Sequence, residues 1–104
     1  MEGYVSLQSL STICYLIRNI PLTLQLQWLE LICQDLTVAW TDNDTLLRAW
    51  ANNRFHDLED KLQDCCAQTI GADYIVTANI KDFRGYSVVP AVTPEELLTI
   101  FNNP

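Results

Sequence analysis

The stretch DLEDKLQDCCAQTIGADYIVTANIKDFRG, residues 57–85, is the most informative part of this 104-residue chain. Its first half predicts a helix over residues 57–70 with Asp57, Asp60 and Asp64 on one face. The apolar stripe predicted on the other side consists of Leu58, Leu62, Cys65 and Thr69. A turn then leads to an apolar strand over residues 74–77, which is followed by Asn79 and Asp82. Carboxylates at a helix start, joined by polar groups after a strand, are the oxygen ligands that a divalent cation takes.

Helical and strand patterns alternate along the rest of the chain. Short strands are predicted over residues 4–7, 36–40, 74–77 and 88–92, and helices over residues 9–19, 22–34, 44–53, 57–70 and 94–102. This order favours an α/β fold in one domain, residues 1–104. We expect a three-layer α/β/α sandwich around a short, mostly parallel sheet of about four strands.

Capping residues mark several of the predicted helix ends. Pro21 and Pro94 suit first helical positions, Thr93 suits an N-cap, and Gly71 suits a C-terminal cap. Asp57 as N-cap and Asp60 three residues later also fit a capping box, which would stabilise the helix without any catalysis. From the residues alone, capping and metal binding remain alternatives for Asp60. Asn79 and Asp82 have a similar alternative as turn residues that bond their own backbone.

The net charge of −7 is the wrong sign for a protein that holds nucleic acid by phosphate neutralisation alone. A bound divalent cation would reverse the local field. Four of the six basic residues also lie in or near the candidate site: Arg54, Lys61, Lys81 and Arg84. The one histidine, His56, is expected to be solvated beside Asp57.

The cysteines indicate a reducing compartment. Cys14, Cys33, Cys65 and Cys66 lie on or beside apolar helix stripes and lack the spacing of a zinc site, so we expect reduced core thiols in a cytoplasmic protein. No apolar run has the length of a membrane span, and the first residues lack the pattern of a secretory signal. We expect no membrane association.

Two motifs carry a resemblance to a known family. DLEDKLQ at residues 57–63 and TANIKDF at residues 77–83 resemble the conserved motifs of PIN domains, the fold of VapC-type toxin ribonucleases. The resemblance implies Asp60, Asn79 and Asp82 as ligands of Mg²⁺ or Mn²⁺, with Asp60 and Asp82 as the catalytic carboxylates. Lys61 stands where the family commonly has Ala, and Ala78 stands where it commonly has Arg.

The chain departs from the family at two acidic positions. Thr12 occupies the position of a Glu in the helix after the family's second strand, and a hydroxyl cannot supply the charge of a carboxylate. The family's first strand, which carries another acidic ligand and lies at the centre of the sheet, has no counterpart. Its absence leaves two inner strand edges, which must pair with each other or be covered by a second chain.

We therefore expect a truncated, degenerate PIN-like protein, catalytically inactive alone and retained as an interaction or dimerisation module. The alternative is an active toxin-type ribonuclease that cleaves RNA phosphodiesters, with its missing ligands supplied upstream or by a partner. An antitoxin-like protein is the partner that the resemblance implies. An unrelated regulatory α/β domain is the third possibility.

The helix predicted at residues 22–34 is apolar nearly all round. One interpretation is a helix buried on two sides of the monomer, and the other is a helix shared with a second subunit. We expect a homodimer that buries Leu24 and Trp28.

Overall fold

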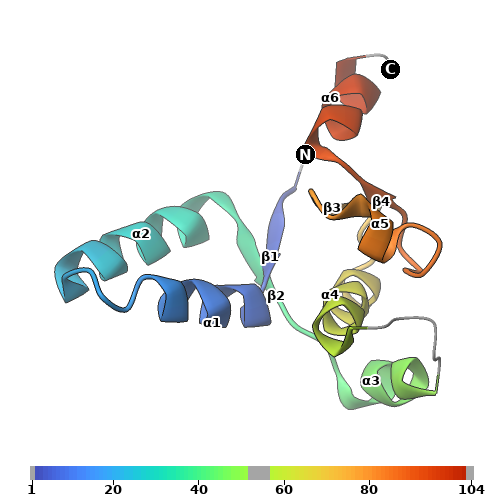
Figure 1. The fold of residues 1–104 in the computed structure, drawn as a ribbon, viewed down its shortest axis with the longest axis horizontal. Helices are drawn as coiled ribbons and strands as arrows, with labels where there is room; N and C mark the ends of the chain where they lie inside the picture. The colour runs from blue at the N-terminus through green and yellow to red at the C-terminus, as the bar shows by residue number, and fades with distance from the viewer. Residues whose placement is uncertain (1, 52–56, 103–104) are drawn as a thin grey trace. The chain divides into compact units, whose positions relative to one another are not determined.

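The computed structural model describes residues 2–51 and 57–102, and Figure 1 shows its ribbon. The chain divides into two compact units, which we call unit 1 (Met1–Trp40) and unit 2 (Thr41–Pro104). Six helices and four short strands follow one another in the described residues. The mixed α/β class predicted from the sequence is confirmed.

Unit 1 is built from two strands with two helices between them. β1 (Tyr4–Ser6) and β2 (Thr37–Ala39) pair in parallel, with Val5 opposite Val38. Between them run α1 (Leu7–Leu16) and α2 (Leu22–Asp35), which leave the strand pair and return to it (Figure 1). The four elements predicted for this region are confirmed, with boundaries that differ by at most three residues.

Neither α1 nor α2 contains a buried residue. The interpretation of residues 22–34 as a helix buried on two sides of the monomer is therefore wrong. The strands of unit 1 are three residues long and cannot cover a helix of 14 residues. Pro21 takes the N-cap position of α2, whereas the sequence analysis predicted it at the first helical position.

Unit 2 begins with two helices that pack against each other. They are α3 (Asn43–Trp50), capped by Asp42, and α4 (Leu58–Thr69), capped by Asp57. The predicted end of the first helix at Asn53 lies outside the described residues. Gly71, at φ +66°, follows the end of α4 in the left-handed conformation that glycine adopts most easily.

The buried face of α4 differs from the predicted stripe. Its buried side chains are Lys61, Asp64, Cys65, Cys66 and Ala67, whereas Leu58 is 62 % exposed. The prediction that Asp64 shares an outer acidic face with Asp57 and Asp60 is wrong. Asp64 is 3 % exposed because its carboxylate accepts the backbone N–H groups of Val88 and Val89, at 3.0 and 3.1 Å.

The second half of unit 2 supplies a parallel strand pair and two helices. β3 (Ile75–Val76) pairs with β4 (Ala91–Val92), and α5 (Ile80–Phe83) lies between them in the sequence. α6 (Pro94–Asn102) follows β4. Thr93 and Glu96 form the predicted start of α6: each side chain accepts the other's backbone N–H, at 3.0 and 3.1 Å. α5 was not predicted.

The described strands form two parallel sheets of two strands each, with the orders β1–β2 and β3–β4. The expectation of one sheet of about four strands is therefore wrong for the described residues. The prediction of parallel pairing is confirmed in both sheets. Strands of two or three residues offer few cross-strand side-chain pairs, which are the contacts that specify a wider sheet.

All four cysteines are free thiols, but only two are in the core. Cys65 and Cys66 are buried on α4, and burial raises the pKa of each thiol. Cys14 and Cys33 are exposed on α1 and α2, so the prediction of core thiols is wrong for this pair. Within residues 2–51 and 57–102, no helix is long and apolar enough to cross a membrane.

Candidate functional site

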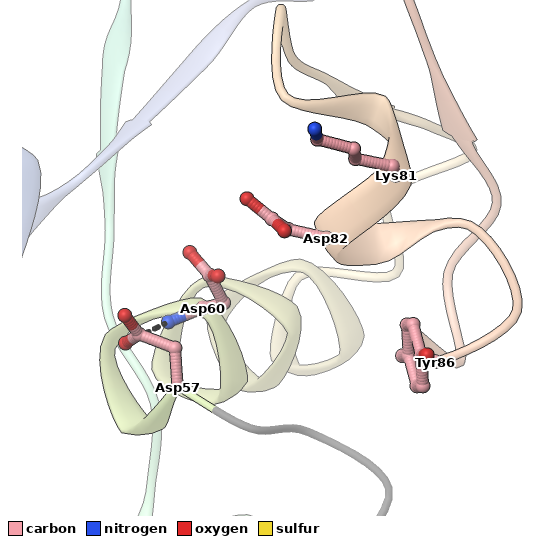
Figure 2. A pocket seen from close by; sticks show the side chains of 5 residues that line it. All are labelled: Asp57, Asp60, Lys81, Asp82 and Tyr86. Atoms are coloured by element: carbon pink, nitrogen blue, oxygen red, sulfur yellow. Dashed lines mark hydrogen bonds between the residues drawn. The ribbon is translucent and has the colours of Figure 1, made fainter.

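The candidate site is a pocket of about 240 Å³ in unit 2. Its lining residues are Asp57, Asp60, Lys81, Asp82 and Tyr86. Figure 2 shows Asp60 projecting from α4 and Asp82 from α5 toward the same space. The structure thus brings together the two carboxylates that the sequence singles out as catalytic candidates.

Asp57 holds the start of α4. Its Oδ1 accepts the backbone N–H of Glu59 at 2.7 Å and that of Asp60 at 3.4 Å, and Figure 2 draws the bond to Asp60. These bonds satisfy two of the N–H groups that a helix leaves without partners at its start. The predicted N-cap is confirmed, and it fixes one carboxylate at the pocket rim for a structural reason.

Asp60 is the site's perturbed acid. Partial burial raises the pKa of its carboxyl above 3.8, and the negative charges of Asp57, Asp82 and Glu59 raise it further. The pocket therefore disfavours a further negative charge at Asp60. A cation placed among these carboxylates would instead favour the ionised form of Asp60 and lower its pKa.

The short helix α5 places Asp82 and Lys81. The hydroxyl of Thr77 accepts the backbone N–H of Asn79 at 3.0 Å, and the carbonyl of Asn79 accepts the N–H of Asp82 at 3.0 Å. Asn79 is the N-cap residue of α5 and is exposed, and its side chain makes no capping bond. It is not among the residues that line the pocket.

Tyr86 is the residue that sequence reasoning missed. Its backbone N–H donates to the carbonyl of Phe83 at 2.9 Å, which turns the chain at the end of α5. Two residues later, Asp64 holds the N–H groups of Val88 and Val89. The loop is fixed at both ends, so the Tyr86 ring becomes part of the wall. The TANIKDF motif ends at Phe83, and no spacing signal extends it to Tyr86.

The remaining predicted site residues lie elsewhere. Lys61 is buried, with its ammonium 5.8 Å from the centre of the Trp50 ring, and Arg84 forms an ion pair with Glu96 at 2.7 Å. Thr12 belongs to unit 1, where its exposed hydroxyl donates to the carbonyl of Gln8. Arg54 and His56 lie outside the described residues. Of the basic residues predicted near the site, the described part of the chain places Lys81 at the pocket.

The side chains of the pocket supply only part of a set of metal ligands. Among the described residues, no three His, Cys, Asp or Glu side chains are grouped closely enough to hold one. Asp57 is engaged in capping, and the Lys81 ammonium shares the pocket with Asp60 and Asp82. The predicted ligand set of Asp60, Asn79 and Asp82 is thus brought together only at its two carboxylates.

Comparisons with known proteins found no family model, curated protein or solved structure that matches this chain.

Proposed function

We propose that this protein is a degenerate PIN-like protein that acts as an interaction module and forms a homodimer. The observation that carries the proposal is the exposure of α2. Leu24 is 45 % exposed and Trp28 is 57 % exposed, on a helix without a buried residue. Large apolar side chains gathered on one surface are typical of protein interaction sites.

The acidic pocket supports both the PIN-like descent and the loss of catalytic activity in this proposal. The resemblance to PIN domains rests on the motifs around Asp60 and Asp82, and both residues line the pocket. Thr12, at the position of a family acid, brings no charge to such a site. Two carboxylates beside an ammonium are a weak set of ligands for a divalent cation, which favours several oxygen donors.

Sedimentation at micromolar concentration tests the interaction role. We expect a dimer that Trp28→Glu converts to a monomer, because the new carboxylate would be buried without a partner. Leu98→Glu is the matched control, since it places the same charge at a 61 % exposed leucine of α6. A chain that stays monomeric under these conditions contradicts the proposal.

A second candidate is a metal-dependent ribonuclease, and the shared pocket of Asp60 and Asp82 favours it. A divalent cation would supply a polarised water and neutralise phosphate charge there. In this candidate, Asp60 and Asp82 are the residues that hold the ion. The test is RNA cleavage with Mg²⁺ or Mn²⁺, comparing the chain with Asp60→Asn. Cleavage that requires the metal and is lost in the variant would replace the inactive interpretation with this one.

A further inference from the structure

We draw no further inference here: the strongest candidate, the exposed apolar surface patch that Leu98 and Phe101 form three residues apart on α6, carries none because nothing in the structure shows what covers it.

Discussion

Removal of the Asp64 carboxylate should destabilise unit 2 and release the loop that carries Tyr86. Asp64 is 3 % exposed, and both of its oxygens are occupied. Oδ1 accepts the N–H of Val89 at 3.1 Å, while Oδ2 accepts the N–H of Val88 and the side-chain amide of Gln68, both at 3.0 Å. One side chain on α4 thus fixes a loop 24 residues further along the chain.

The expected cost of Asp64→Ala is about 2–4 kcal/mol in the free energy of unfolding. The Val89 N–H is buried and would lose its acceptor, which costs about 1–3 kcal/mol. Val88 is 61 % exposed and Gln68 is half-buried, so water can replace part of each lost bond, at a cost of about 0.5–1.5 kcal/mol each. Removing the buried carboxylate also recovers part of the energy that was spent on taking it out of water. The expected total is therefore smaller than the sum of the three largest hydrogen-bond costs.

Urea unfolding measures this loss, and native-state hydrogen exchange locates it. The amides of Val88 and Val89 should exchange faster in the Asp64→Ala variant than in the parent chain. Asp64→Asn should fall in between, because its amide keeps one acceptor and turns a donor toward the other backbone N–H. Asp73→Ala is the control for removing an exposed carboxylate. The reasoning is refuted if Asp64→Ala and Asp73→Ala differ by less than about 0.5 kcal/mol, a change typical of surface substitutions.

Three further changes probe unit 2. The raised pKa of Asp60 means that the folded state holds the carboxyl proton more tightly than the unfolded state does, so the contribution of Asp60 to the free energy of unfolding falls as pH rises through and above 3.8. The Asp60→Asn variant should therefore gain stability relative to the parent chain between about pH 4 and pH 7, which urea titrations of both proteins at each pH measure. Gly71→Ala should lower the free energy of unfolding by about 1 kcal/mol, because φ +66° strains a residue with a Cβ although nothing lies within 4 Å of it; an unchanged thermal midpoint would contradict this. Thr93→Ala should cost about 1 kcal/mol and Thr93→Ser much less, since the hydroxyl caps α6; equal losses in calorimetry would show that the cap is not the cause.

The features that could be predicted from the sequence are the ones that short-range chemistry decides. Asp57 and Thr93 cap α4 and α6 as predicted, because a side-chain oxygen reaches only the N–H groups two or three residues ahead. Gly71 follows α4 because a left-handed residue is needed there. The alternation of helices and strands was predicted correctly for the same reason, because the spacing of apolar residues within each segment indicates its secondary structure.

The sheet arrangement and α5 could not be predicted in the same way. α5 has four residues, which is about one helical turn and too short to show a period. β3 and β4 have two residues each, so their sequences specify almost nothing about which edge pairs with which. The prediction of one wider sheet used the order of the elements, and that order does not fix the pairing when the strands are this short.

Only part of the candidate site could be predicted, because two carboxylates of the same helix, Asp60 and Asp64, are placed by different kinds of information. Asp60 lies at the pocket since it is three residues from the helix cap, a spacing visible in the sequence. Asp64 has the same helical register in principle, yet it faces the interior. The side that α4 buries is set by what packs on it, and the loop at Val88 and Val89 offers two backbone donors for which Asp64 is the acceptor. A carboxylate at helical spacing therefore becomes a pocket residue or a structural anchor according to a partner far along the chain. The Asp64 variants separate these roles, because an anchor changes the exchange of the Val88 and Val89 amides and a pocket acid does not.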